Sequence, residues 1–180
     1  PLAAALLDDL AARTQAAVAD IRRVVYALRP PALDDLGLVS ALREQAAQYQ
    51  GVHVSVEVPA ALPVLPAAVE VAVYRIVQEA LTNVARHARA RTSCVRLEWD
   101  QAAGLLHLEV VDDGRGIDAR QRMGVGLHSM RERAVELGGT WSIEALPAGG
   151  TRVQAVLPLR RSAAGEVPNH PIGVLSRSEP

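Results

Sequence analysis

The hydrophobic and polar positions along the chain predict one long helix at its start. Apolar or small side chains recur at alternating spacings of four and three residues from 2 to 28, which makes a sustained heptad seam. Such a seam favours a helix in a bundle or dimer over a helix that packs only on its own domain. Pro30 and Pro31 follow the seam and are expected to end this helix.

From residue 36 onward the pattern alternates between helical and strand periods. Valines alternate with polar residues over 52–58, as in a half-buried strand. The predicted elements are helices at 36–49, 67–88 and 127–137, and strands at 52–58, 93–99, 105–111, 140–145 and 151–157. The second helix carries the clearest buried stripe, formed by Val69, Val73, Ile76, Ala80, Val84 and Ala88. Helices placed between hairpin strands favour an α+β fold, a two-layer sandwich with helices on one face of a mixed sheet.

Composition narrows the classes of function that the chain can serve. Of its 180 residues 49% are hydrophobic and 22% are charged, so the chain can bury a core. A net charge of −1, with no Phe, two Trp and three Tyr, argues against a nucleic-acid partner. A single cysteine, Cys94, fits a reducing, cytoplasmic compartment. No apolar run approaches the roughly 20 residues that span a bilayer, so a membrane connection is expected only upstream of Pro1.

Polar side chains gather on one stripe of the helix predicted at 67–88. Glu79, Asn83 and His87 are spaced four residues apart, and Arg86 lies beside them. Carboxylate and amide oxygens suit a hard cation such as Mg²⁺, which also binds phosphates, and Arg86 and His87 would face those phosphates. Taken alone, the same spacing is equally consistent with an ordinary solvated helix face.

A carboxylate is predicted on the buried side of strand 105–111. Asp112 continues the alternation of that strand with the parity of its apolar residues. A buried carboxylate needs hydrogen-bond donors, and the exocyclic amine of adenine is one. Gly114 and Gly116 would let a ring approach the backbone closely. The alternative is a plain Asp113-Gly114 turn, against which the parity of Asp112 argues.

Two further glycine segments follow. Gly124-Val125-Gly126 leads into a predicted helix, whose backbone N–H groups could face an anion. It completes neither the dinucleotide-binding pattern nor the P-loop pattern. Gly149-Gly150-Thr151 alone indicates only a hairpin turn with a hydroxyl at the start of a strand.

These segments, taken in order, resemble the GHKL ATPase superfamily. Within it they are most similar to sensor histidine kinases whose response regulators carry helix-turn-helix output domains. The similar segments are Glu79–Ala88 (the N box), Asp112–Gly116 and Gly124–Leu127 (two glycine boxes), Met130–Arg133 with Gly138-Gly139, and Gly149–Thr151 (the last box). Upstream, Leu28–Leu33 and Gly37-Leu38 resemble the link from a dimerisation hairpin to the catalytic domain. The resemblance covers about residues 5–160.

The resemblance implies a Bergerat ATP-binding fold and a role for each matched residue. Asn83 would coordinate Mg²⁺ with help from Glu79, and Asp112 would bind the adenine amine of ATP. Thr151 would support the adenine pocket, and Arg86 and His87 would contact phosphate. The pocket floor and the hinges of a lid over ATP would be formed by the glycine boxes, namely Gly114, Gly116, Gly124, Gly126 and the adjoining Leu127. The loop 113–126 is accordingly expected to be mobile without nucleotide.

The resemblance also implies a division of the chain. Residues 1–31 would be the second helix of a dimerisation hairpin, 32–160 the ATP-binding catalytic domain, and 161–180 a flexible tail. Expected partners are a second copy of the kinase and a response regulator. None of the five histidines, His53, His87, His107, His128 and His170, lies on the predicted hairpin helix, so the phosphate-accepting histidine is expected upstream.

Three alternatives share part of this pattern. A serine-protein kinase of the anti-sigma type and an ATPase of the gyrase and MutL kind carry the same boxes. The Arg29-Pro30-Pro31 segment, the heptad helix and the short predicted lid at 117–123 argue against both. A dimerisation module with an inactive nucleotide site is the non-enzymatic alternative, and the presence of all four boxes argues against it.

Overall fold

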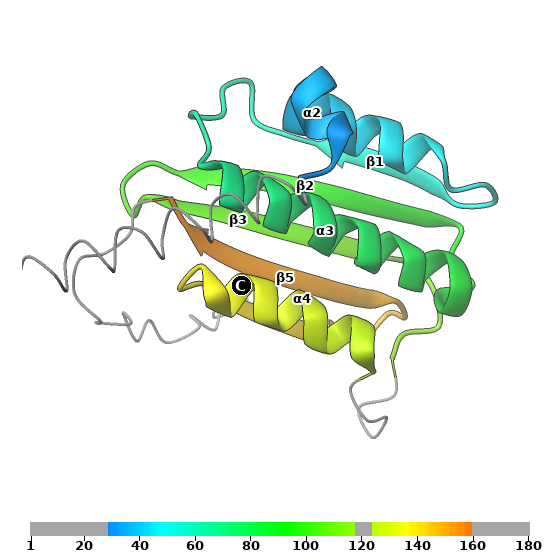
Figure 1. The fold of residues 1–180 in the computed structure, drawn as a ribbon. Coiled ribbons are helices and arrows are strands. Elements are labelled where there is room, and N and C mark those ends of the chain that lie inside the picture. Colours follow the sequence, from blue (N-terminus) through cyan, green and yellow to red (C-terminus); the bar gives the residue numbers. More distant parts are fainter. Residues whose placement is uncertain (1–28, 118–123, 160–180) are drawn as a thin grey trace, which may run out of the picture.

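The computed structural model describes residues 29–117 and 124–159, and helices cover one face of its five-stranded sheet (Figure 1). Its elements are α2 (Pro31–Ala47), β1 (His53–Glu57), α3 (Ala67–Asn83), a π-helical turn η1 (Val84–Ala88), β2 (Thr92–Asp100), β3 (Leu105–Asp112), α4 (Val125–Glu136), β4 (Thr140–Ala145) and β5 (Thr151–Pro158). The predicted helix 2–28, the tail 161–180 and residues 118–123 of the glycine loop lie outside the described residues. Within the described ranges, no helix is long and apolar enough to cross a membrane.

The sheet is mixed, as predicted, and its strand order is β1-β2-β3-β5-β4. β1 runs parallel to β2, and all other neighbouring strands are antiparallel. The α+β, two-layer prediction is therefore confirmed. β3 lies between β2 and β5, with Val111 opposite Arg152. This pairing places the end of β3 beside the start of β5, and so Asp112 beside Thr151.

The core lies between the sheet and the helices, with α3 in the middle of the helical layer (Figure 1). All six residues of the stripe predicted on residues 67–88 are buried, with exposures of at most 7%. Burying one such aliphatic side chain stabilises a fold by about 1.5–3 kcal/mol, so this stripe fixes α3 against the sheet. A fixed α3 gives its polar side chains a fixed place on the opposite stripe.

The helix predicted at 36–49 differs from α2 at both ends. α2 begins at Pro31 and ends at Ala47. Pro31 occupies the first helical position, where proline loses no intrahelical hydrogen bond. Gly37, with φ 72° and ψ 167°, interrupts the helix and separates a first turn from the main part. The residues before this break therefore do not share the helical period that follows it.

The last turn of the helix predicted at 67–88 is not α-helical. α3 ends at Asn83, and Val84–Ala88 form a π-helical turn. The i→i+5 bonding of this turn replaces the α-helical bonding that the prediction assumed from Val84 to Ala88. π-helical turns are frequent at functional sites. α4 in turn begins at Val125, two residues earlier than predicted, with Gly124 as its N-cap.

Candidate functional site

Two of the glycine segments approach the C-terminal half of α3 and the η1 turn that follows it. Gly126, in the first turn of α4, lies so close to Glu79 that a methyl group added there would overlap the Glu79 carboxylate. Gly114 lies against Ala88, whose carbonyl oxygen also accepts a hydrogen bond of 2.9 Å from the backbone of Arg115. The approach of Gly114 requires glycine because a side chain would meet the backbone of Ala88, whereas at Gly126 the Glu79 carboxylate could shift.

The turn before β5 makes a similar approach to β3. A methyl group on Gly150 would overlap the backbone oxygen of Asp112, and Gly150 has a φ of +96°, which favours glycine. Gly116, with φ +76°, lies near Gly150, whose oxygen would be 3.0 Å from an added methyl group. The first and last glycine boxes therefore meet at the end of β3.

Asp112 is buried, which confirms the prediction from its parity. Its side chain is 6% exposed, and its Oδ1 accepts a 2.8 Å hydrogen bond from the backbone N–H of Gly114. Burial raises the pKa of Asp112 above its ordinary value, whereas hydrogen bonds from Gly114 and Thr151 oppose that rise. Thr151 is itself buried at the start of β5. The carboxylate is thus held by donors on one side in a site that excludes most water.

The neighbouring Asp113 has a different, structural role. Its carboxylate accepts hydrogen bonds from the backbone N–H groups of Arg91 (2.7 Å) and Thr92 (2.9 Å) and from the Thr92 hydroxyl (2.9 Å). The hydrogen bonds from Thr92, and then that from Arg91, hold the pKa of Asp113 below its ordinary value. Asp113 therefore ties the end of β3 to the start of β2, a contact that its neighbour Asp112 does not make.

The polar strip predicted on residues 67–88 is only partly assembled. Glu79 and Asn83 are half-buried one turn apart on α3, whereas Arg86 and His87 are exposed on η1. Within the described part of the chain, no hydrogen bond or ion pair joins these four side chains to one another. Glu79 and Asn83 thus form one oxygen-rich group, and Arg86 and His87 a separate exposed pair.

The remaining predicted residues fall into two kinds. Gly124 faces open space, so steric contact does not require glycine there. Leu127 is half-buried and packs against the main core, which fixes the first turn of α4. One notable residue escaped prediction. Arg89 follows η1 with φ 54° and ψ 31°, and it is the only non-glycine residue with positive φ among the described residues. Its sequence offers no signal, since Asn, Asp or Gly is the usual choice there.

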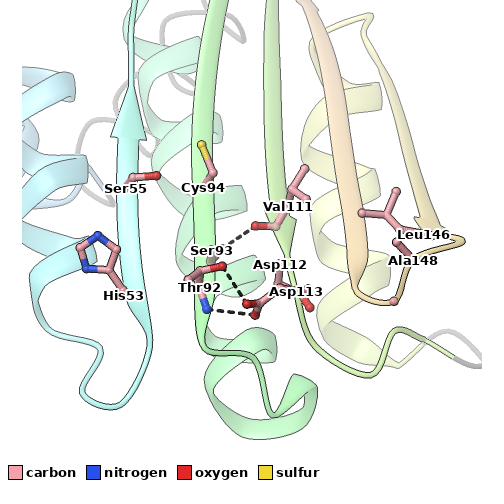
Figure 2. A pocket seen from close by; sticks show the side chains of 11 residues that line it. His53, Ser55, Thr92, Ser93, Cys94, Val111, Asp112, Asp113, Leu146 and Ala148 are labelled. Atoms are coloured by element: carbon pink, nitrogen blue, oxygen red, sulfur yellow. Dashed lines mark hydrogen bonds between the residues drawn. The ribbon is translucent and has the colours of Figure 1, made fainter.

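A separate cavity of about 400 Å³ lies at one end of the sheet (Figure 2). Ser55, Cys94 and Val111 line it from paired positions of β1, β2 and β3, on the face that the helices leave open. Leu146 and Ala148 complete it from the turn before β5. Of the predicted site residues, Asp112 alone lines this cavity. The cavity is therefore distinct from the group around Glu79 and Asn83.

A family model described as "Histidine kinase-, DNA gyrase B-, and HSP90-like ATPase" matches residues 68–161, just over half of the chain. The chain belongs to this ATPase family. The matched segment runs from the first turn of α3 through η1, β2, β3, α4 and β4 to the end of β5. The described core is therefore an ATP-binding domain of this family, as the four glycine and polar segments predicted.

Relatives of this ATPase domain are sensor kinases. The chain is 37% identical over 145 residues to the signal transduction histidine-protein kinase/phosphatase UhpB of Salmonella typhimurium, covering 78% of this chain and 28% of that protein. It is 35% identical over 164 residues to the sensor histidine kinase MctS of Rhizobium johnstonii, covering 87% of this chain and 35% of that one. DegS of Brevibacillus brevis, a histidine-protein kinase/phosphatase, is 32% identical over 158 residues, with coverage of 85% and 40%. The chain spans well under half the length of these curated relatives.

Solved structures support the fold. The blue-light activated histidine kinase of Erythrobacter litoralis EL346 superposes with a TM-score of 0.57 at 24% identity, over 68% of this chain and 45% of that chain. The mycobacterial sensor histidine kinase MprB superposes with a TM-score of 0.53 at 21% identity, over 68% of this chain and 93% of that one. At these identities the likeness shows the fold alone, and it is the fold predicted for this ATPase family.

Proposed function

We propose that this ATPase domain is the catalytic domain of a sensor histidine kinase. It would bind ATP with Mg²⁺ and transfer the γ-phosphate to a histidine upstream of this sequence, for relay to an aspartate of a response regulator. The buried Asp112, enclosed by the glycine turns at 114 and 150, is the observation that carries the proposal. The sensor-kinase relatives favour this function over a gyrase-type ATPase.

The adenine of ATP would bind at Asp112. An ionised carboxylate has about four acceptor positions, and Gly114 and Thr151 supply donors to this one. An exocyclic amine would therefore find a remaining acceptor on a group that is otherwise costly to bury. Thr151 would support the same contact, either directly or through water.

Magnesium would bind between α3 and the phosphates. Glu79 and Asn83 present a carboxylate and an amide oxygen from adjacent turns, which suits a cation that keeps waters and binds phosphate as well. When bound, Mg²⁺ would neutralise charge on the phosphate oxygens. Arg86 and His87, exposed on the adjoining η1, would approach the phosphates from the same end of the helix.

The glycine segments would provide the floor and the hinges of the nucleotide site. Gly114 and Gly116 bring the backbone after β3 close to η1 and to the turn before β5. Gly124, Gly126 and Leu127 carry the chain into α4, where Gly126 touches Glu79. This contact would connect the position of the segment before α4 to the proposed metal ligand.

In the proposed phosphoryl transfer, the main task of this domain would be to position ATP relative to the acceptor histidine. The acceptor imidazole nitrogen would bond to the γ-phosphorus while the bond to the bridging oxygen breaks and ADP leaves. The imidazole proton would pass to a base next to the acceptor. Phosphoryl transfer depends mainly on in-line placement and charge neutralisation, for which the proposed residues suffice. A homodimer, a response regulator and a cytoplasmic location, with any membrane attachment upstream, are the corresponding proposals for the whole protein.

Isothermal titration of the chain with ATP or ADP and Mg²⁺ tests the site. Asp112→Ala should abolish binding, because it removes the buried carboxylate proposed to accept from the adenine amine. Asp113→Ala is the matched control, because it removes the adjacent aspartate, which supports the β2 and β3 ends instead. Equal affinity of the Asp112 variant and the unaltered chain would refute the adenine assignment.

The metal assignment has its own titration. Asn83→Ala should leave nucleotide binding measurable but remove most of its dependence on Mg²⁺, because the amide oxygen is a proposed ligand of the cation and makes no contact with the base. Thr82→Ala, one residue earlier on α3, is the control because the Thr82 hydroxyl is already engaged with the Gln78 carbonyl oxygen at 2.7 Å. An unchanged Mg²⁺ dependence in the Asn83 variant would remove this residue from the metal site.

Incubation with γ-labelled ATP tests transfer. The chain alone should acquire no acid-labile label, because its histidines are not expected to reach an in-line position. It should label a longer form of the protein that carries the upstream acceptor and Asp112→Ala, if transfer runs between protomers. Label on the chain alone would contradict the expected place of the acceptor.

A further inference from the structure

One ion-pair cluster lies far from the nucleotide site, where the chain enters the described domain. Arg29 has a side chain only 10% exposed, and its Nε donates to Asp34 Oδ1 at 2.6 Å. Its Nη2 donates to Glu70 Oε2 at the same distance of 2.6 Å. Nη1 also approaches the carbonyl oxygen of Ala67 at 3.5 Å. One guanidinium therefore bridges two elements, with no role in the site proposed above.

The position of Arg29 is unusual for a cation. Asp34 lies in the first turn of α2 and Glu70 in the first turn of α3, so Arg29 faces two helix N-termini. The dipole of a helix disfavours positive charge at that end, and the two carboxylates must offset this cost. Asp34 and Glu70 alone would already stabilise their helices. The cation adds a link between elements that neither helix needs for itself.

The link is stiff on both sides. The planar guanidinium fixes the geometry of both charged hydrogen bonds, which a flexible ammonium would not. Pro30 follows directly, is buried, and accepts a 2.9 Å hydrogen bond from the backbone of Leu33. Pro31 then begins α2. Two prolines and a paired arginine leave the backbone at residue 29 little freedom relative to α3.

α3 connects this link to the nucleotide site. Glu79 lies nine residues after Glu70, which is about 14 Å along a helix at 1.5 Å per residue. The stripe between them is buried along one side of a continuous helix, so any shift of α3 relative to the sheet would carry Glu70, Glu79 and Asn83 together. A force on Glu70 therefore reaches Glu79 and Asn83 without needing to pass through any loop.

We propose that Arg29 is a positioning residue that couples the backbone before α2 to the nucleotide site through Glu70 and α3. This inference rests on the proposed function, since it requires nucleotide to bind at Glu79 and Asn83. Coupling between two sites is reciprocal: if the upstream backbone influences nucleotide binding, nucleotide must influence the upstream backbone equally.

Hydrogen exchange on the full 180-residue chain, with and without Mg²⁺ and a non-hydrolysable ATP analogue, tests this coupling. In the unaltered chain the nucleotide should slow exchange of amides in peptides spanning residues 20–30 by about fivefold or more, the lower end of usual coupling. In Arg29→Gln and Glu70→Gln that slowing should fall to less than about twofold, whereas the analogue itself still binds.

The variants are graded so that a folding defect does not obscure the result. Asp34→Asn should weaken the effect less than Glu70→Gln, because Asp34 is 64% exposed and does not belong to α3. Arg29→Lys keeps the positive charge but loses the planar set of guanidinium N–H donors, so it should give an intermediate response. Arg43→Gln, an exposed arginine elsewhere on α2, is the control and should behave like the unaltered chain.

Two results would overturn the proposal. One is an unaltered chain in which bound nucleotide leaves residues 20–30 unchanged. The other is a nucleotide effect on residues 20–30 that persists in both Arg29→Gln and Glu70→Gln. If the urea midpoints of these variants fall while the nucleotide effect persists, the ion pairs have a structural role only. Calorimetric titration separates a failure of the proposed function from a failure of the proposed coupling. If the unaltered chain does not bind nucleotide, the proposed function is refuted, and the coupling with it.

Discussion

Asp112 shows at the scale of one residue how a proposed binding group can oppose the stability of its own fold. Burial raises its pKa, so the folded state binds the carboxyl proton more readily than the unfolded state. For such a group the contribution to stability is full below the unfolded pKa and is lost as pH rises through the folded pKa. At neutral pH the ionised Asp112 therefore destabilises the folded domain.

Asp112→Asn should consequently raise the free energy of unfolding at neutral pH by about 1 kcal/mol, a gain typical of relieving functional strain. The amide oxygen can keep the hydrogen bond from Gly114. Urea unfolding at pH 7.5 and at pH 4 measures the difference, which should shrink as pH falls and Asp112 becomes protonated. Nucleotide affinity should fall in the same variant. A variant less stable than the unaltered chain at pH 7.5 would contradict this account.

Glycines in the proposed site differ in what a methyl group would meet. Gly114→Ala would drive the methyl group into the backbone oxygen of Ala88, which cannot move cheaply, so we expect a loss of about 2–3 kcal/mol. Gly126→Ala would instead displace only the Glu79 carboxylate, the mobile end of a side chain. Its stability should change by less than about 1 kcal/mol, because alanine also favours the helix. Nucleotide affinity should nevertheless fall about tenfold or more.

Gly124→Ala provides the matched control for both substitutions, because nothing lies within 4 Å of the added methyl group. Its stability should fall by only about 0.5–1 kcal/mol, the cost of alanine at the N-cap position of α4. Urea unfolding and calorimetric titration of the three variants give the comparison. If Gly114→Ala and Gly124→Ala lowered stability equally, the close approach to Ala88 would not be what requires glycine at position 114.

At the scale of elements, the features that could be predicted are those with a local side-chain period. The features that were missed depend on contacts with backbone far along the chain. Strands and the buried stripe of α3 follow from side-chain alternation, which one segment carries by itself. The π-helical turn at Val84–Ala88 does not, because five residues cannot distinguish the two helical periods. Its last carbonyl, that of Ala88, is met by Arg115, which lies 27 residues further along the chain. Such a contact is invisible in local sequence.

The same distinction between local pattern and distant contact applies to the candidate site. Asp112 was placed by strand parity and is buried as expected. The prediction of one continuous α-helix from 67 to 88 was wrong at its last turn, where Val84–Ala88 are π-helical. The contact of Gly126 with Glu79 joins two elements through their packing, so no spacing in the sequence could reveal it.

The exit from η1 allows a direct test of backbone strain. Arg89 holds a left-handed conformation, which costs a non-glycine residue about 1–2 kcal/mol. Arg89→Gly should relieve this cost, and a net gain of about 0.5–1 kcal/mol should remain after the entropy cost of glycine. Arg91→Gly, two residues away at a position without positive φ, should instead lose a similar amount. Urea midpoints that move in the same direction for both variants would exclude the strain.

At the scale of the whole molecule, the sheet separates two faces with different roles. One face holds the core, the helices and the proposed nucleotide site. The opposite face carries a row of ion pairs across β1, β2, β3, β5 and β4, in which Glu109 is central. Its carboxylate meets Arg96 Nη1 at 2.9 Å and Arg152 Nε at 3.0 Å. These side chains bind the strands to one another from the face opposite the nucleotide site.

Glu109→Gln should therefore lower the urea midpoint without affecting nucleotide binding. The substitution leaves two arginines on neighbouring strands without the carboxylate that joins them, so the loss should be larger at low ionic strength than at high. Glu98→Gln on β2 is the control, because within the described residues Glu98 forms no ion pair, and it should leave the midpoint nearly unchanged. Nucleotide affinity should stay within about twofold in both variants, since residues on opposite faces with no shared partners act independently. A marked change of affinity in Glu109→Gln alone would mean that the open face communicates with Asp112 through the sheet.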